Sequence, residues 1–306
     1  MVLEKTWGRV LVAPALALGA LAAGACGIPH AGPGQIAVVG AESQYADVLS
    51  QIGGAFVSVS AIVRNPSADP HNFEASTSVA REIAQARLIV QNGDGYDAFM
   101  NQIESATSNP SRRVVTVARL RHQSSAANPH FWYDPTTMPL VARTVTGDLI
   151  ALAPRHGAYF RAREATFLSR WQRVTRAIAA ARRAVAGWRV ATTEPVGDDL
   201  LAALGLVNLT PWRFQADVMN GVDPSPEDLA TQQDLLTHRR VLALVYNSQV
   251  ASPVTAGLRS LAVAHAVAVV PIAEIMPPRL HVQDWLLGEV TRLESQLRYV
   301  ATGEGP

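Results

Sequence analysis

A long stretch in the middle of the chain, almost free of helix-breaking residues, constrains the fold most. Apart from Pro154 and Gly157, residues 154–186 contain no proline or glycine. Their apolar side chains recur at steps of three, four and seven residues and form one stripe: Phe160, Phe167, Trp171, Val174, Ile178, Ala181 and Val185. This spacing predicts a helix of roughly 33 residues, about 50 Å long, with one buried face. Arginines occupy the outer face of this predicted helix. That face is either simply solvated or a docking surface.

Short apolar segments on both sides of this helix predict strands. They occupy residues 36–40, 57–63, 88–90 and 114–117 before the helix, and residues 241–246 and 267–272 after it. Segments with helical spacing lie between several of them, and this alternation is typical of a parallel α/β sheet.

The two halves of the chain share a pattern. The segment that starts at Val190 can be aligned with the segment that starts at Val38, and each runs through a strand, an acidic loop and a helix that ends in glycine. Each also places a glutamate, Glu42 or Glu194, at the C-terminal end of a strand, where open α/β sheets bind ligands. The predicted fold is therefore α/β, with two similar lobes joined by one long rigid helix. Each lobe is a parallel sheet flanked by helices, and the cleft between the lobes holds the ligand.

The start of the chain predicts export. Lys5 and Arg9 precede an apolar run of roughly 16 residues, which is shorter than the about 20 that a membrane span needs, so we interpret it as a secretory signal. The run ends in a sequence that resembles a bacterial lipobox, with Cys26 as the lipid-bearing residue. The alternative is an ordinary signal peptide with an incidental cysteine. The predicted boundaries are a signal peptide at 1–25, a tether at 26–34, a first lobe at 35–153, the linking helix at 154–186 and a second lobe at 187–306.

The bulk composition excludes some classes of function. The chain is 48% hydrophobic and 17% charged, which describes an ordinary globular protein, and its length of 306 residues agrees with two lobes. The net charge is +1, and no cluster of basic residues is interleaved with aromatic ones, so we expect no nucleic-acid partner. Cys26 is the single cysteine, so disulfides do not stabilise the fold.

Two histidines follow prolines in separate loops, and both are candidate metal ligands. The motifs are Asp69-Pro70-His71 and Asn128-Pro129-His130-Phe131-Trp132-Tyr133-Asp134-Pro135. Because proline fixes its own backbone and restricts the residue before it, each imidazole is held stiffly. Glu194 and Glu274 stand at strand ends in the second half. Two imidazoles and two carboxylates from both lobes would form a four-ligand cage, which suits Zn²⁺ or Mn²⁺.

These motifs resemble those of the metal-binding lipoproteins of bacterial ABC importers for zinc and manganese. The resemblance covers nearly the whole chain, including Thr193-Glu194-Pro195 and the long helix. It implies that His71 and His130 bind the metal, that Glu194 is the third ligand and that Glu274 is the fourth. In that family many zinc binders carry His at the third position and many manganese binders carry Glu. The short segment 119–128, which lacks a His-rich loop, also favours manganese.

The resemblance also implies a cellular role. The protein would be extracytoplasmic, monomeric and anchored to the cell membrane by lipid on Cys26. It would capture Zn²⁺ or Mn²⁺ as a transported ligand and deliver the ion to an ABC permease with its ATPase subunit. The alternatives are a surface adhesin or metal-storage lipoprotein on the same fold, and a secreted metallohydrolase. The hydrolase is disfavoured, and no enzymatic activity is expected, because a catalytic zinc usually keeps an open position for water.

Several local alternatives stay open for the candidate ligands. Glu194 could instead cap the helix that follows it, since acids favour that end of a helix. Glu274 would be explained by a solvated loop. Glu42, the counterpart of Glu194 in the first half, is a reserve candidate for a ligand.

Overall fold

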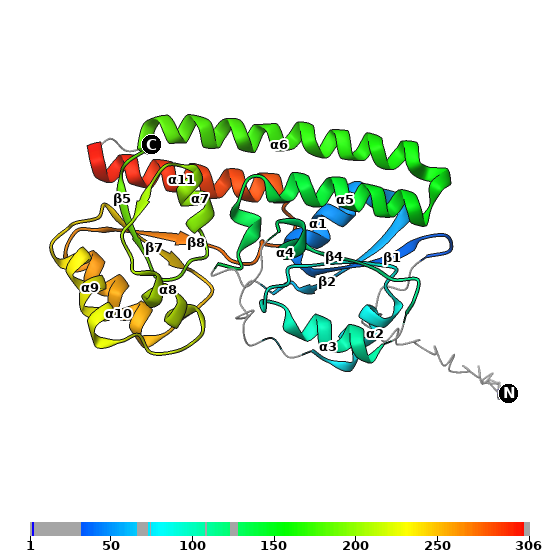
Figure 1. Cartoon of the computed structure of the whole chain (residues 1–306), viewed down its shortest axis with the longest axis horizontal. Coiled ribbons are helices and arrows are strands. Elements are labelled where there is room, and N and C mark those ends of the chain that lie inside the picture. The colour runs from blue at the N-terminus through cyan, green and yellow to red at the C-terminus, as the bar shows by residue number, and fades with distance from the viewer. Residues whose placement is uncertain are drawn as a thin grey trace.

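The structure is a computed structural model that describes residues 2, 32–65, 73, 75–107, 109–122 and 128–302. The predictions for Cys26, for the signal peptide and for His71 lie outside these residues. Two α/β lobes lie side by side beneath a pair of long helices (Figure 1). Among the described residues, no helix has both the length and the apolar character that crossing a membrane requires.

The two sheets have the same topology. The first contains β1 (Ile36–Glu42), β2 (Val57–Val63), β3 (Leu88–Gln91) and β4 (Arg113–Thr116), all parallel, in the order β2-β1-β3-β4. The second contains β5 (Arg189–Thr192), β6 (Val207–Asn208), β7 (Ala243–Asn247) and β8 (Ala268–Ile272), all parallel, in the order β6-β5-β7-β8. The prediction of two similar parallel lobes is confirmed.

The strand register shows which residues of the two lobes are equivalent. In the first lobe Gly40 of β1 lies opposite Val90 of β3. In the second lobe Thr192 of β5 lies opposite Val245 of β7. In the first lobe, Glu42 stands two residues after Gly40, and Asn92 stands two residues after Val90. In the second lobe, Glu194 and Asn247 stand at the same distance from Thr192 and Val245. The internal repeat therefore extends from the strands to the polar residues that follow them.

Helices cover both faces of the sheets. Those of the first lobe are α1 (Ser43–Gly53), α2 (Thr77–Gln85), α3 (Ala98–Ala106), α4 (Val117–Leu120) and α5 (Thr137–Leu152). Those of the second lobe are α7 (Asp198–Ala203), α8 (Trp212–Met219), α9 (Pro226–Thr237) and α10 (Pro253–Ala264). Short 3-10 turns are η1 (Gly54–Phe56), η3 (Phe131–Tyr133) and η4 (Pro154–His156).

Close contact between β1 and α1 fixes the direction in which the chain leaves the first strand. A Cβ atom on Gly40 would lie 2.3 Å from the backbone nitrogen of Ala46, so glycine is what allows the helix to turn back tightly on the strand. Glu42 lies inside this turn, at the junction of β1 and α1.

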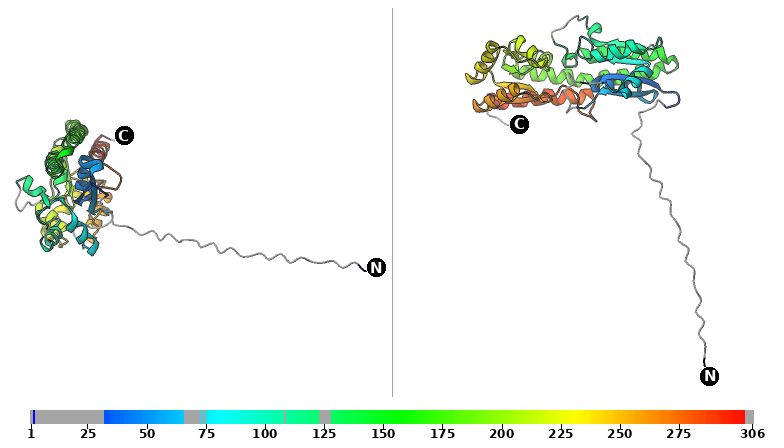
Figure 2. Two further views of the ribbon diagram at one scale, coloured as in Figure 1. Left: turned by 90° about the vertical axis from the view of Figure 1, so that its right-hand side faces the viewer. Right: turned by 90° about the horizontal axis from the view of Figure 1, so that it is seen from below.

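The predicted long helix is present as α6 (Gly157–Val185), and its buried face is the predicted apolar stripe. A second long helix that the sequence patterns did not predict, α11 (Val282–Thr302), packs along α6 (Figures 1 and 2). The start of α11 reaches the first lobe, where the backbone N–H of Val282 donates to Asp47 of α1 at 2.8 Å. The two lobes are therefore joined by two parallel helices.

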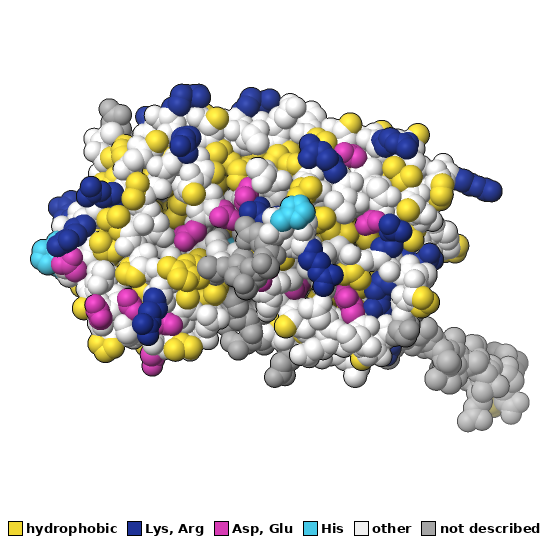
Figure 3. Space-filling view, viewed as in Figure 1, with side chains coloured by type: hydrophobic (Ala, Val, Ile, Leu, Met, Phe, Trp, Pro, Cys, Tyr) yellow, Lys and Arg dark blue, Asp and Glu magenta, His cyan; other side chains and the backbone are white. Residues whose placement is uncertain are grey.

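The outer side of α6 is basic, as the sequence predicts. Arginine side chains lie along the edge of the molecule that this helix forms (Figure 3). Two of them are not merely solvated. Arg163 donates to the carbonyl of Gln51 at 2.6 Å, and Arg182 donates to the carbonyl of Ala203 at 3.0 Å. These bonds attach the helix to α1 in one lobe and to the end of α7 in the other.

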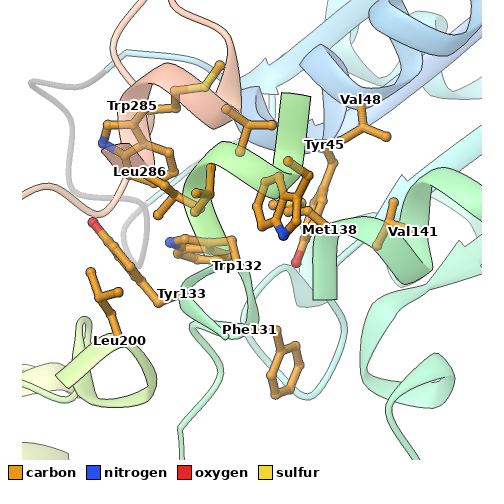
Figure 4. Packing of buried hydrophobic residues seen from close by; sticks show 14 of the residues in the cluster. Tyr45, Val48, Phe131, Trp132, Tyr133, Met138, Val141, Leu200, Trp285 and Leu286 are labelled. Atoms are coloured by element: carbon orange, nitrogen blue, oxygen red, sulfur yellow. The ribbon is translucent and has the colours of Figure 1, made fainter. Parts of the chain in front are cut away.

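One hydrophobic core runs through both lobes beneath the long helices. Its centre is η3, where Trp132 packs edge-on against Tyr45 of α1, with ring centroids 6.3 Å apart. Tyr133 faces the opposite way and packs against Trp285 of α11 at 5.4 Å (Figure 4). Leu200 of α7 lies next to Tyr133 in the same view. The aromatic triplet after His130 thus packs against residues of both lobes.

Candidate metal centre

The candidate ligands that the structure describes come together where the strand ends of the two lobes face each other. His130 stands immediately before η3 in the first lobe. Glu194 follows β5 and Glu274 follows β8, each two residues beyond its strand. His130 and Glu274 are fully buried and Glu194 is 3% exposed. The interpretation of Glu274 as a solvated loop acid is therefore wrong.

One contact across the lobes joins His130 and Glu274. The imidazole Nε2 of His130 lies 3.3 Å from Oε1 of Glu274. At the other side of the ring, Nδ1 lies 2.7 Å from Oδ1 of Asn128, and the same oxygen accepts the backbone N–H of His130 at 3.1 Å. Because Oδ1 is an acceptor, Nδ1 is the nitrogen that carries the proton in the neutral ring, and Nε2 is then the atom that could coordinate a metal. A histidine whose other ring nitrogen is held in this way is typical of metal sites.

Glu194 and Glu274 are linked by one amide. Nδ2 of Asn247, at the end of β7, donates to Oε2 of Glu194 at 3.2 Å and to Oε2 of Glu274 at 2.7 Å. The helix that follows Glu194 begins at Asp198, and its N-cap residue is Gly197. Glu194 is therefore not the cap of this helix, and its side chain is turned towards Glu274.

The loop that carries Glu274 has a defined shape. The side-chain oxygen of Gln249 accepts the backbone N–H of Glu274 at 2.8 Å and that of Ile275 at 2.6 Å. From the first lobe, the hydroxyl of Tyr96 donates to Oε1 of Glu274 at 2.7 Å. The pKa of Tyr96 is raised well above its usual range, first by burial and then by the charges of Glu274 and Glu42.

A second network holds the loop of His130. Asp97 accepts the backbone N–H groups of Asn92 and Gly93, each at 2.7 Å. Asn92 in turn donates from Nδ2 to the carbonyl of Pro129 at 2.9 Å and accepts from the hydroxyl of Tyr45 at 2.7 Å. Burial raises the pKa of Asp97 despite these backbone donors. Asn92 therefore orients the loop of the first lobe, whereas its counterpart Asn247 orients the carboxylates of the second.

Glu42 is the most unusual side chain near these groups. It is fully buried, and neither of its carboxyl oxygens has a hydrogen-bond partner within the part of the chain that the structure describes. Burial, and next the charges of Asp97 and Glu274, raise its pKa well above the model-compound value of 4.5. The carboxyl group therefore keeps its proton to a higher pH than a free glutamate does. A cation bound next to it would favour the charged form.

The described residues supply part of the predicted cage. Within them, no group of three or more His, Cys, Asp or Glu side chains is arranged to hold a metal ion. The described residues do bring His130 and Glu274 into contact. Glu194 joins this pair indirectly, because Asn247 donates hydrogen bonds to both glutamates. This donor set fits a divalent cation, because imidazole nitrogen and carboxylate oxygen are ligand types that borderline and hard ions prefer.

The sequence patterns missed some of the residues that support the site. Asn247 and Asn92 carry a signal that was available, since both stand two residues beyond equivalent points of β7 and β3. Asn128 is part of the motif around His130, but its role as the acceptor for Nδ1 follows from the geometry alone. Tyr96 has no pattern around it that would distinguish it from other loop tyrosines.

The chain is similar to several known proteins. Residues 38–287 match the family described as zinc-uptake complex component A, periplasmic. The chain is 24% identical over 232 residues to the metal ABC transporter substrate-binding lipoprotein FimA of Streptococcus parasanguinis, covering 71% of this chain and 74% of that one. It is 26% identical over 125 residues to a putative metal-binding protein of Chlamydia trachomatis, covering 38% of this chain and less than half, 43%, of that protein.

A solved structure shares the fold. The solute-binding protein FpvC of Pseudomonas aeruginosa, solved in complex with Mn²⁺, matches with a TM-score of 0.72 and 17% identity, covering 86% of this chain and 98% of that one. The family match extends over both lobes and includes His130, Glu194 and Glu274. The chain therefore belongs to the periplasmic zinc-uptake component A family, the metal-binding solute-binding proteins of ABC importers.

Proposed function

We propose that this protein captures one divalent metal ion, Zn²⁺ or Mn²⁺, between its two lobes with His71, His130, Glu194 and Glu274. The ion is transported cargo and not a catalytic cofactor. The observation that carries the proposal is the approach of His130 Nε2 to Oε1 of Glu274 across the lobes, at 3.3 Å. His71 enters the proposal through its Asp-Pro-His motif.

The composition of the site limits which ions fit. Imidazole nitrogen with carboxylate oxygen suits borderline and hard ions, and no thiolate is present to favour Cu⁺. With two carboxylates the set is richer in oxygen than a site of three imidazoles, which favours Mn²⁺ relative to such sites. Zn²⁺ still has the higher intrinsic affinity for most mixed donor sets.

The partner that we propose is an ABC permease with its ATPase subunit. Membership of the importer family and the matched substrate-binding lipoprotein support this role rather than that of an adhesin or a storage protein. We also propose that the protein has no catalytic activity, acts as a monomer outside the cytoplasm and is held at the membrane by lipid on Cys26. Labelled fatty acid should enter the wild type and not Cys26→Ala, and incorporation into the variant would refute the anchor.

The proposed function is tested by titrating metal into metal-free protein. Calorimetry at neutral pH should give one site per chain for Zn²⁺ and for Mn²⁺, and each ion should raise the melting temperature. A ligand that binds only the native state stabilises it by about 4 kcal/mol at a thousandfold excess over Kd. Absence of heat and of thermal shift with both ions would contradict the proposal.

A further inference from the structure

We propose that Glu42 is an additional donor to the transported ion, an oxygen ligand from the first lobe that favours Mn²⁺ over Zn²⁺. The inference rests on the proposed function and assigns to that site a residue beyond the four ligands already named.

The position of Glu42 in the fold is that of a ligand. Strand register makes it the counterpart of Glu194, because both stand two residues beyond the paired positions Gly40 and Thr192. These positions are the C-terminal ends of parallel strands, where α/β sheets bind ligands. The first lobe thus carries a glutamate at the strand end equivalent to that of Glu194 in the second lobe.

The surroundings of Glu42 bring it close to the loop that carries Glu274. The next residue, Ser43, donates from its hydroxyl to the carbonyl of Met276 at 3.0 Å, a contact between the lobes. The charge of Glu42 acts on Tyr96, whose hydroxyl is bonded to Glu274. Glu42 and Glu274 also act on each other electrostatically. Glu42 therefore lies near enough to Glu274 for the two charges to interact, and its neighbour Ser43 contacts the loop that carries Glu274.

The burial of Glu42 requires a group that satisfies its carboxyl oxygens. The side chain is fully buried, and among the described residues neither oxygen has a hydrogen-bond partner. A buried carboxyl without donors costs free energy, so native proteins retain one where something else satisfies it. Among the described residues, the titratable groups coupled to it are Tyr45, Tyr96, Asp97 and Glu274, and none of these is a cationic residue. A cation is the group that would satisfy both oxygens and balance this acidic surrounding.

The number of ligand atoms determines for which ion the affinity increases. Zn²⁺ is satisfied by four ligands in a tetrahedral arrangement. Mn²⁺ prefers more ligands, mostly oxygen, in an octahedral arrangement. A further carboxylate oxygen from Glu42 would therefore strengthen the binding of Mn²⁺ and add little to the binding of Zn²⁺.

The test compares Glu42→Gln with the wild type. Glutamine keeps the size and shape of the side chain and removes its charge. Both ions are titrated into the metal-free proteins by calorimetry. We expect the affinity for Mn²⁺ to fall by about tenfold or more, and the affinity for Zn²⁺ to change by less than about threefold. Co²⁺ gives a second readout, because its visible absorption is strong when it has four ligands and weak when it has more. The variant should show the stronger band.

Glu289→Gln is the matched control. Glu289 is nearly as buried as Glu42, at 2% exposed, but it is paired with Arg292 at 2.7 Å on α11. Its replacement should leave the ratio of the Mn²⁺ and Zn²⁺ affinities and the Co²⁺ spectrum unchanged. An equal change in both variants would show that the loss of any buried carboxyl alters the site, and would overturn the specific role of Glu42.

The outcomes separate this inference from the function on which it rests. If the wild type binds neither ion, the proposed function fails. If the wild type binds both and Glu42→Gln keeps the same affinity ratio and Co²⁺ spectrum, the proposal for Glu42 is wrong and the function stands. If the variant does not fold, the Mn²⁺-loaded wild type gives the answer. Its structure must place a Glu42 oxygen within about 2.0–2.6 Å of the ion, and a carboxyl outside that range overturns the proposal.

Discussion

His130 and Glu274 are separated by 144 positions in the chain, yet Nε2 of one lies 3.3 Å from Oε1 of the other. The contact joins the two lobes at a point that is closed to solvent, since both side chains are fully buried. The aromatic residues directly after His130 fill the core between the lobes, which fixes this separation. The geometry of the site is thus determined by packing and not by flexible loops.

Replacing His130 by Ala should weaken the binding of Zn²⁺ and Mn²⁺ by more than about 100-fold. Loss of a residue that merely supports a ligand costs about 10- to 100-fold in metal affinity, and His130 supplies the donor atom itself. His281→Ala is the control, because His281 is half-exposed and pairs with Asp47 at 2.8 Å. Calorimetric titration measures both, and equal losses would show that His130 is not a ligand.

Replacing Asn247 by Ala should destabilise the metal-free protein by about 1–3 kcal/mol, because two buried carboxylates lose a shared donor. A bound cation compensates for this loss, so the rise in melting temperature on adding metal should be larger in the variant than in the wild type. Asn220→Ala, which removes an exposed side chain bonded within its own helix, should change neither value. A smaller rise in Asn247→Ala would contradict the assigned role of Asn247.

The stability of the metal-free protein should fall as the pH rises through the acidic range, partly because of Glu42. Its pKa in the folded protein is raised well above the model-compound value of 4.5, so between the two pKa values the folded state binds the extra proton. Stability then decreases with rising pH. Glu42→Gln removes this contribution. Its melting temperature relative to the wild type should therefore be higher at pH 7.5 than at pH 4.5, and a constant difference would contradict the raised pKa.

Replacing Glu194 by His should shift the selectivity of the site towards zinc. The variant would have three imidazoles and one carboxylate, and nitrogen-rich sites suit Zn²⁺ whereas oxygen-rich sites suit Mn²⁺. We expect the affinity for Mn²⁺ to fall while that for Zn²⁺ stays within about tenfold, or about 1.4 kcal/mol. Competition between the two ions measures the ratio. An unchanged ratio would mean that Glu194 does not touch the ion.

The sequence predicted the elements whose pattern is local. The stripe of α6 follows from helical periodicity, and every residue assigned to it is buried in the structure. The repeat between the segments that start at Val38 and Val190 was visible because strand, loop and helix recur in the same order, and the register of the two sheets agrees with it. The predicted positions of Glu194 and Glu274 beyond their strands came from the same patterns.

What the sequence did not predict depends on distant parts of the chain meeting. The course of α11 along α6 is set by contacts such as that between Val282 and Asp47, which no local period reveals. The amide of Asn247 binds two carboxylates because β5, β7 and the loop after β8 converge in space. Glu42 appeared as a reserve candidate through the repeat alone, because its burial and its unpartnered oxygens are properties of the folded chain.

The most direct test of the central claim is an anomalous difference map from crystals of the protein loaded with Zn²⁺ or Mn²⁺. The account predicts one strong peak between the lobes, within about 2.0–2.2 Å of His130 Nε2 and of carboxylate oxygens of Glu194 and Glu274, with His71 as the remaining nitrogen ligand. A peak elsewhere on the molecule, or an ion in the cleft that does not contact His130 and Glu274, would contradict it.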